Sequence, residues 1–469
     1  MKILVYIDQP SQQKYVEEVR LAATRIQDAE VVVAGPGVAS GYFSVAGTNI
    51  APPTSSPRRK WPRLAAVARS TFRRIRGLRR SGAVVARALG TALAVLTAAV
   101  VVPNRTLSAI RLVRRVNPDV VVVLEDNCEG LTGFVTDASR RLRRPLLVVP
   151  CFIPNPDEPA KYYQHDRSHW ISGLIGWCVA SVWSHWEHQY DGVALLRLPA
   201  ETIILYGLVG RRVVRPWILN SGFAAAIAVE SETSRRRYIQ LGFRASKLHL
   251  VGDGLSDELF KHSCFAEKHG VAVRSRYFED PTKPLIVCAF PPDQYEESPN
   301  PAFEYQSYDT LAAGWFDAFR VLGESSNVLV CVHPRMAVGT LQRLESPSVR
   351  LAAGHLHEVL PHADIFVASA STTIGWALSL GIPVINYDCY RFGYADFRAA
   401  SGVVHITDRV AFSAALREIL GGGLAVLTRK AVDEASDWGL VDGGYQRRLA
   451  GLLVEVAQRR GIATPTHDV

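Results

Sequence analysis

Short apolar runs alternate with amphipathic stretches along most of the chain. The first run covers residues 3–7, residues 13–28 repeat apolar positions at helical spacing, and the next run covers 31–34. Runs that are apolar throughout are typical of parallel strands covered on both faces. Further strands are predicted at 119–125, 145–149, 224–229, 248–251, 285–290, 328–332, 365–368 and 384–386, and helices at 130–142, 231–242, 309–323, 356–362 and 373–380. The order indicates an α/β protein.

The chain length indicates more than one domain. At 469 residues, two large domains are expected. A polar segment at 276–284 ends in proline and favours a boundary there. We therefore expect a first domain over 1–278, a second over 279–425, and C-terminal helices over 426–469 that cross back to the first.

An insertion at 53–104 departs from this alternation. Ten lysines and arginines lie between Pro57 and Arg80 with no acid, so the remaining residues carry about −1 of the net charge of +9. The next 20 residues, 83–102, contain one charge, Arg87, and are long enough to span a bilayer. The insertion is interpreted as a helix on an anionic membrane surface, involving residues 57–102. A buried helix beside a solvated basic segment, a true span and a nucleic-acid site are the alternatives. Sparse aromatic residues argue against nucleic acid as a partner.

The cysteines and the N-terminus bear on location. Seven scattered cysteines without a CxxC pair are typical of free thiols in a reducing compartment. The first residues, MKILVYID, predict a strand rather than a signal peptide. We expect a cytoplasmic protein, peripheral on the inner face of the cell membrane.

A hydroxyl-rich loop is the most informative chemical feature. Ser369, Ser371, Thr372 and Thr373 follow the strand predicted at 365–368 and lead into a helix. Hydroxyls and backbone N–H groups at such a turn suit a phosphate, although one of them would suffice to cap the helix. His333 ends the strand predicted at 328–332, and we expect this strand to be the neighbour of the strand at 365–368 in the sheet.

Several segments around this loop resemble a known superfamily. The segments are Val332-His333-Pro334, HADIFVASAS at 362–371 and ALSLGIPVIN at 377–386. They are similar to the nucleotide-binding domain of GT-B-fold enzymes, which include nucleotide-sugar glycosyltransferases and the non-hydrolysing UDP-N-acetylglucosamine 2-epimerases. Upstream, 118–150 and 226–259 resemble first-domain and inter-domain parts of that superfamily. The resemblance implies two Rossmann-like domains facing a cleft.

Departures from the epimerases favour a transferase. An acid pair expected after the phosphate loop is replaced by the apolar residues 374–377, and a His-Arg pair is replaced in the loop 290–294. The helix from Thr373 also lacks the glutamate with which retaining transferases of this fold hold the ribose, which favours inversion. His333-Pro334 and Ser371-Thr372 also resemble motifs of bacterial sialyl- and Kdo-transferases that use CMP donors.

The resemblance implies a glycosyltransferase that moves a sugar from a nucleotide-sugar donor to a cell-envelope glycan or a lipid-linked acceptor. Its candidate residues for acid-base catalysis are Asp126, Glu129 and His169, and those for donor binding are His333, Arg335, Ser369, Ser371, Thr372, Thr373, Asp388 and Arg391. Glu125 is expected to be paired in the structure. The donor is a substrate, so no cofactor is expected.

No metal is expected either, because the sequence has no DxD motif and His185 and His188 lack a third ligand. The alternatives are an enzyme similar to the 2-epimerases, or a non-catalytic nucleotide-binding protein associated with the membrane.

Overall fold

The computed structural model describes residues 1–9, 12–36, 42–44, 49–50, 84–151, 154–295, 303–323, 325–333, 336, 339–393 and 396–460. The basic residues between 57 and 80 and the donor candidate Arg335 lie outside these ranges. The chain divides into two compact units. Unit 1 comprises residues 1–229, 235–249 and 446–469, and unit 2 comprises 230–234 and 250–445.

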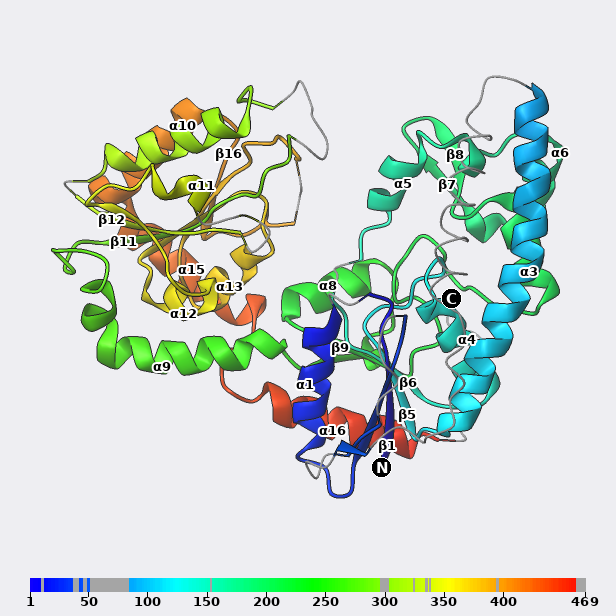
Figure 1. Cartoon of the computed structure of the whole chain (residues 1–469). Coiled ribbons are helices and arrows are strands. Elements are labelled where there is room, and N and C mark those ends of the chain that lie inside the picture. Colours follow the sequence, from blue (N-terminus) through cyan, green and yellow to red (C-terminus); the bar gives the residue numbers. More distant parts are fainter. Residues whose placement is uncertain are drawn as a thin grey trace. The chain divides into compact units, whose positions relative to one another are not determined.

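Unit 1 is built on one sheet with the strand order β10-β9-β6-β5-β1-β2-β3-β4. The bounds are β1 Lys2–Tyr6, β2 Glu30–Ala34, β3 Tyr42–Ser44, β4 Asn49–Ile50, β5 Val120–Val123, β6 Leu146–Val148, β9 Ala226–Val229 and β10 Leu248–Leu250. Neighbouring strands in the series β9, β6, β5, β1 and β2 pair in parallel, whereas β3 is antiparallel to both β2 and β4. Its helices include α1 (Gln13–Ala23), α4 (Thr132–Arg141), α8 (Glu232–Gln240) and α16 (Tyr445–Gln458). Figure 1 shows α1 and α4 on opposite sides of this sheet. The buried, β-branched strands explain why the runs are apolar throughout.

The apolar stretch of the insertion begins a long helix, α3, over Val84–Val116. The sequence analysis expected the apolar part to end at residue 102, but the helix continues through Pro103. From Val102 onward, buried residues recur every three or four positions, at Val102, Thr106, Ala109, Val113 and Val116. This half of α3 is therefore the packed half.

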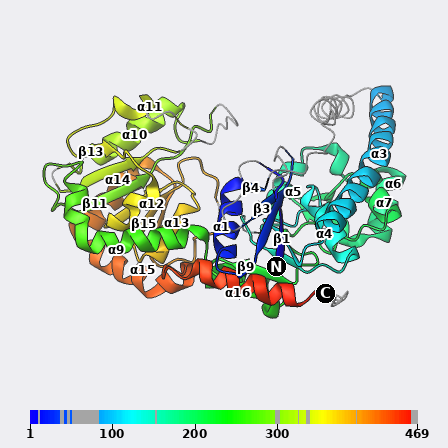
Figure 2. The same ribbon diagram turned by 60° about the horizontal axis from the view of Figure 1, so that its bottom comes forward.

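A compact group of small elements joins β6 to β9. It contains α5 (Asp157–Tyr163), α6 (Gly173–Val182), the antiparallel hairpin of β7 (Glu187–Tyr190) and β8 (Val193–Leu196), and α7 (Ala200–Leu208). Helix α7 packs against both α3 and α6, and both ribbon views place α6 next to α3 (Figures 1 and 2). The sequence patterns did not predict these elements.

Unit 2 is a second parallel sheet, with the order β13-β12-β11-β14-β15-β16. Its strands are β11 Leu285–Ala289, β12 Asn327–Cys331, β13 Val349–Leu351, β14 Ile365–Ala368, β15 Val384–Tyr387 and β16 Val403–Ile406, and its helices include α9 Gly254–Arg274, α10 Tyr308–Arg320, α11 Gly339–Gln342, α12 Leu356–Val359, α13 Thr373–Ser379, α14 Arg409–Glu418 and α15 Leu424–Trp438. One face carries a buried aromatic cluster in which Trp315 stacks on Tyr387, and Tyr387 stacks on Phe412. The predicted pair of Rossmann-like α/β sheets is confirmed.

The chain enters unit 2 at Leu250, before the boundary expected at residue 278. The 21-residue helix α9, which the sequence analysis did not predict, packs on α12 and belongs to unit 2. At the other end, α15 belongs to unit 2 and residues 446–460 belong to unit 1. The guanidinium of Arg459 donates a 2.9 Å hydrogen bond to the carbonyl oxygen of Ala225 beside β9, which fixes α16 there.

Candidate active site

Each sheet reverses its strand order next to a central strand. In unit 1 the reversal lies at β1 and β5, and in unit 2 at β11 and β14. Loops at the carboxyl ends of such strands diverge to opposite faces of the sheet and leave a crevice, where ligands of open α/β sheets bind. Functional side chains are therefore expected at these two switch points.

Carboxylates gather at the switch point of unit 1. Asp8 follows β1, and Glu125 follows β5 with only 8% of its surface exposed. The pKa of Glu125 is raised to about 7, mainly by burial and also by the negative charges of Asp8, Asp126 and Glu129, while the charge of Arg197 opposes the rise. A pKa near neutrality suits a general base or acid.

Asp8 is held at the first turn of α4. One of its oxygens accepts hydrogen bonds from the backbone N–H (3.1 Å) and the hydroxyl (3.2 Å) of Thr132. Burial still raises the pKa of Asp8. A Cβ at Gly130 would lie 2.3 Å from the same oxygen, so the backbone can approach Asp8 this closely only at a glycine.

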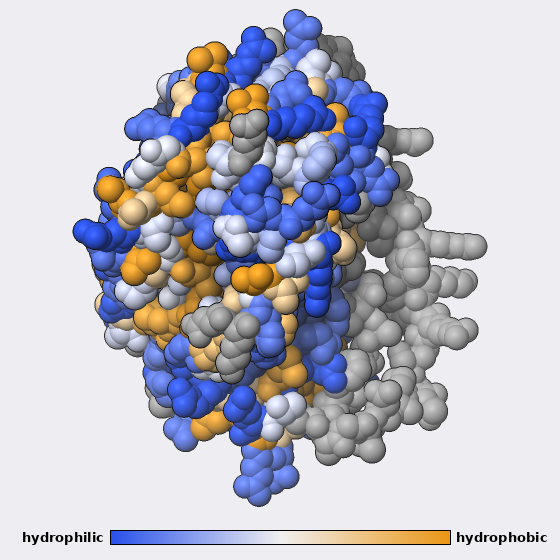
Figure 3. Space-filling view, turned by 90° about the vertical axis from the view of Figure 1, so that its left-hand side faces the viewer, coloured by the Kyte–Doolittle hydropathy of each residue, from blue (hydrophilic) through white to orange (hydrophobic). Residues whose placement is uncertain are grey.

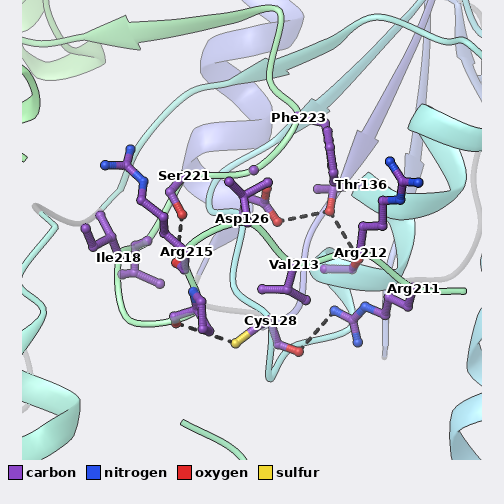
Figure 4. A pocket seen from close by; sticks show the side chains of 15 residues that line it. Asp126, Cys128, Thr136, Arg211, Arg212, Val213, Arg215, Ile218, Ser221 and Phe223 are labelled. Atoms are coloured by element: carbon purple, nitrogen blue, oxygen red, sulfur yellow. Dashed lines mark hydrogen bonds between the residues drawn. The ribbon is translucent and has the colours of Figure 1, made fainter. Parts of the chain in front are cut away.

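Asp126 occupies a separate, partly buried place. Its carboxylate accepts a 2.9 Å hydrogen bond from the Thr136 hydroxyl and lines a cavity of about 20 Å³ with Arg211 and Phe223 (Figure 4). Its pKa is raised to about 6, mainly by burial, while the Thr136 hydrogen bond and the charge of Arg211 oppose the rise. The cavity has room for about one water molecule and not for a sugar.

The segment 209–225 encloses this cavity. Asn220 exchanges two hydrogen bonds with the backbone of Asp126, at 2.8 and 3.1 Å. The Arg211 guanidinium lies between the rings of Phe134 (3.9 Å) and Tyr206 (4.1 Å) and donates to the Cys128 carbonyl oxygen. Arg211 and Asp126 thus both hold the covering segment in place.

The other two catalytic candidates have structural partners. Glu129 pairs with the guanidinium of Arg197 at 2.5 Å and accepts a 2.6 Å hydrogen bond from the Tyr163 hydroxyl. The imidazole of His169 is only 5% exposed, stacks on Tyr163 with 3.9 Å between ring centres, and has Nδ1 3.0 Å from the Leu196 carbonyl oxygen. This geometry favours a role in packing α5 onto the β7–β8 hairpin for both residues.

The hydroxyl-rich loop of unit 2 follows β14 as predicted. Ala370 adopts a positive φ of 45°, and its N–H donates to the side-chain oxygen of Asn386 at 2.9 Å. The hydroxyls of Ser371 and Thr373 are hydrogen-bonded at 2.8 Å, and Ser369 contacts the Cys389 sulfur at 3.4 Å. Thr372 is exposed. The loop therefore presents several hydroxyls at the carboxyl edge, held by the neighbouring strand β15.

His333 is not beside this loop in the sheet. It follows β12, and β11 pairs with both β12 and β14, so the expectation that the two strands are neighbours was wrong. Apolar runs show which segments form strands but not their order in the sheet, so they also allow the run at 285–289 to lie between the strands at 328–332 and 365–368. Strand β11 therefore lies between the strand that leads to His333 and the strand that leads to the hydroxyls.

Asp388 and Arg391 lie in the loop after β15. Both carboxylate oxygens of Asp388 accept backbone N–H groups, from Phe392 at 2.9 Å and Gly393 at 2.7 Å. Arg391 is exposed and has a φ of 54°. Asp388 therefore shapes the loop, while Arg391 projects from it.

Within the described ranges, no group of three or more His, Cys, Asp or Glu side chains is arranged to hold a metal ion. All seven cysteines are free thiols. Asp8 was not predicted from the sequence, and Glu125 was expected to be paired. The sequence signal for both residues was their position, because Asp8 and Glu125 each come directly after an apolar strand.

No family model matches the chain, and no curated protein matches its sequence. Solved structures do match. MnaA of S. aureus, in a co-structure with UDP, is 11% identical, with 98% of this chain and 97% of that chain covered and a TM-score of 0.50. The UDP-GlcNAc 2-epimerase from Neisseria meningitidis bound to UDP-GlcNAc is 12% identical, with coverages of 98% and 100% and a TM-score of 0.49. A variant of the wall teichoic acid polymerase TagF is 10% identical over 72% of this chain and 73% of its own, with a TM-score of 0.42. At such identities a likeness establishes architecture only. With its two sheets, each reversed at a central strand, the chain has the GT-B fold.

Proposed function

We propose that the protein is a nucleotide-sugar-dependent glycosyltransferase. The observation that carries the proposal is the chemical difference between its two switch points: carboxylates gather at that of unit 1, and hydroxyls at that of unit 2. Phosphates are repelled by carboxylates and suit hydroxyl and N–H donors. The donor diphosphate is therefore assigned to the loop 369–373, with Arg391 as a further contact. His333 and Arg335, which follow β12 in sequence, are assigned to donor binding on the other side of β11.

Glu125 is the proposed general base. It lies at the carboxyl edge of the sheet with a pKa near neutrality, whereas Asp126 is hydrogen-bonded to Thr136 and lines a cavity too small for a sugar, and Glu129 is paired with Arg197. As Glu125 takes the proton of the acceptor hydroxyl, the oxygen's electron pair forms the bond to the anomeric carbon. The bond from that carbon to the phosphate oxygen breaks, and the nucleoside diphosphate or monophosphate leaves with the electron pair. The hydroxyls of the loop stabilise the charge on the leaving phosphate.

Inversion at the anomeric carbon and a metal-independent reaction are parts of the proposal. Helix α13 contains no acid in its sequence TIGWALS, so it has no carboxylate for the donor ribose. The acceptor is proposed to be a cell-envelope glycan or a lipid-linked sugar, reached from the inner face of the cell membrane. No cofactor is proposed.

A donor screen tests the proposal. Thermal unfolding is measured with UDP, CMP, GDP and TDP, because a ligand that binds only the native state raises the midpoint. The corresponding nucleotide sugars are then incubated with the protein, with and without cell-envelope extract, and release of nucleotide and loss of donor are followed. Transfer or slow donor hydrolysis is expected, and Glu125→Gln should abolish turnover while nucleotide binding stays unchanged.

The other outcomes are distinct. Conversion of UDP-N-acetylglucosamine to its 2-epimer without an acceptor would replace the proposal with an epimerase-like function. Nucleotide binding with no turnover of any donor would indicate a non-catalytic binding protein. The absence of both binding and turnover would overturn the proposal.

A further inference from the structure

The N-terminal half of α3 is apolar but not packed. From Ala92 to Val101 the sequence ALAVLTAAVV has one polar residue, and no position in it is buried. Leu96 and Val100 are among the most exposed large hydrophobic residues of this half. An apolar helix in a folded domain normally buries one face. Here that burial begins only at Val102.

Helix α6 has the same property. Its sequence, GLIGWCVASV, contains no charged residue. Gly176, Val179 and Ala180 are buried, while Leu174 is 82% exposed and Trp177 is 63% exposed. Ile175 and Val182 are exposed as well. Most of the large apolar side chains of α6 therefore point away from the core, although a helix packed on a soluble domain normally buries them.

Helix α7 joins these two apolar helices into one surface. It packs against both α3 and α6, and Leu208 at its end is 76% exposed. Exposed large hydrophobic residues also occur in unit 2, as at Val321, Val410 and Val426, and the face shown in Figure 3 has hydrophobic areas among hydrophilic side chains. Clustered apolar residues of this size indicate an interaction surface rather than ordinary exposure.

We propose that this surface, defined as residues 92–101, α6 and the end of α7, docks on an anionic lipid bilayer. Two features identify the occupant. Ten positive charges without an acid lie between Pro57 and Arg80, directly upstream of α3 in sequence, and complement anionic headgroups. Among the described residues, Trp177 is the only exposed tryptophan, and tryptophan is enriched at the membrane–water interface.

The proposal adds α6 and α7 to a membrane contact expected only from 57–102. It rests on the proposed membrane location and not on sugar transfer. Lipid binding and donor binding are measured separately, so that each can fail alone. Length and composition also admit two helices as spanning, Ala92–Val116 in unit 1 and Arg409–Trp438 in unit 2. However, one face of α3 is buried in unit 1 from Val102 onward, and shallow contact fits that packing better than a span.

Two exposed cysteines provide matched probes. Cys178 lies on α6 in the proposed surface, and Cys264 lies on α9 in unit 2. The full chain is labelled with a polarity-sensitive fluorophore at Cys178 in Cys264→Ser, and at Cys264 in Cys178→Ser. Phosphatidylglycerol vesicles should shift the emission of the first label to the blue, and lipid-borne quenchers should quench it. The second label should not respond.

Substitution tests the contribution of the apolar side chains. Replacing Leu174 and Ile175 with Asn and Trp177 with Gln should reduce partition into phosphatidylglycerol vesicles at least tenfold, because each side chain loses its apolar burial in the bilayer. The matched control replaces the exposed Val321, Val410 and Val426 of unit 2 with Asn and should bind as the unaltered chain does. Circular dichroism confirms the fold of both.

Three results would overturn the proposal. One is vesicle binding without a response of the Cys178 label, which would assign the contact to another part of the chain. Another is a label shift in the absence of lipid that follows the appearance of a dimer, which would make the surface an interface between copies. The third is no vesicle binding at all.

Discussion

At the residue scale, Glu125 and Glu129 are four positions apart and have opposite expected effects on stability. The pKa of Glu125 rises from 4.5 to about 7 in the folded protein, so its ionisation opposes folding. That penalty is absent below about pH 4.5, grows as pH rises, and is complete above about pH 7, where it amounts to about 3 kcal/mol. Glu125→Gln should therefore raise the free energy of unfolding by up to this amount at pH 8 and leave it unchanged at pH 4. Urea unfolding at both values checks this.

Glu129→Gln serves as the control. It leaves the buried Arg197 without a charged partner, and should lower the free energy of unfolding by about 1.5–3 kcal/mol at pH 8. A loss of stability in both variants would contradict the view that Glu125 is an unpaired, functional acid. A gain in stability with loss of turnover is the pattern expected of an active-site group.

The hydroxyls of the donor loop give a second residue-scale prediction. The double substitution Ser371→Ala and Thr372→Ala should weaken binding of the donor nucleotide at least tenfold, since each hydrogen bond to a charged phosphate contributes about 1.5–3 kcal/mol. Isothermal titration with the nucleotide found in the screen measures the effect. Ser379→Ala, at the far end of α13, removes only a bond to the Trp376 carbonyl oxygen and should bind normally. Unchanged affinity in the double variant would limit these hydroxyls to capping the helix.

At the element scale, the segment 209–225 depends on a glycine. A Cβ at position 222 would lie 1.9 Å from a carboxylate oxygen of Asp126, so Gly222→Ala must displace the segment or the acid. The expected loss is about 1–3 kcal/mol of unfolding free energy, the usual cost of overpacking. Thermal and urea unfolding measure it.

A double-mutant cycle identifies the cause. In an Asp126→Ala background the added methyl group has room, so the second substitution should cost less than it does alone. Gly451→Ala on α16 is the matched control, because nothing lies within 4 Å of its Cβ position, and it should be neutral or slightly stabilising. Additive losses at 222 and 126 would show that the close contact is not what matters.

At the scale of the whole molecule, unit 1 depends on the last helix of the chain. Leu453 on α16 is fully buried, and residues from 446 onward belong to unit 1 although unit 2 precedes them in sequence. Leu453→Ala should destabilise unit 1 by about 2–5 kcal/mol. Differential scanning calorimetry should show one transition shifted down and the other unchanged.

Leu416→Ala provides the reciprocal case, because Leu416 is fully buried in the core of unit 2. It should shift the other transition. If each variant lowered both transitions equally, the two units would unfold as one cooperative block, and their division in the contact pattern would have no thermodynamic counterpart.

The sequence by itself determined most of the alternating strands and helices. Strands such as 120–123 and 365–368 are so apolar and β-branched that only a sheet covered on both faces accommodates them, and the loop at 369–373 follows from the residues alone. Helix α9 was missed because its polar and apolar positions lack a strong periodicity. The elements from α5 to α7 were missed because they are short and depend on packing against one another and, for α7, against α3.

Only the tertiary structure decided which of these residues meet. Strand order is a property of the assembled sheet, so β11 separates His333 from the hydroxyl loop although nothing in the sequence places it there. Neighbouring acids also have different environments: the backbone of Asp126 is hydrogen-bonded to Asn220, which is nearly a hundred residues away in sequence, while Glu125 feels the negative charge of Asp8 at the switch point. Local patterns fix the local backbone, but pKa values and enclosure depend on charges and surfaces that only folding brings together.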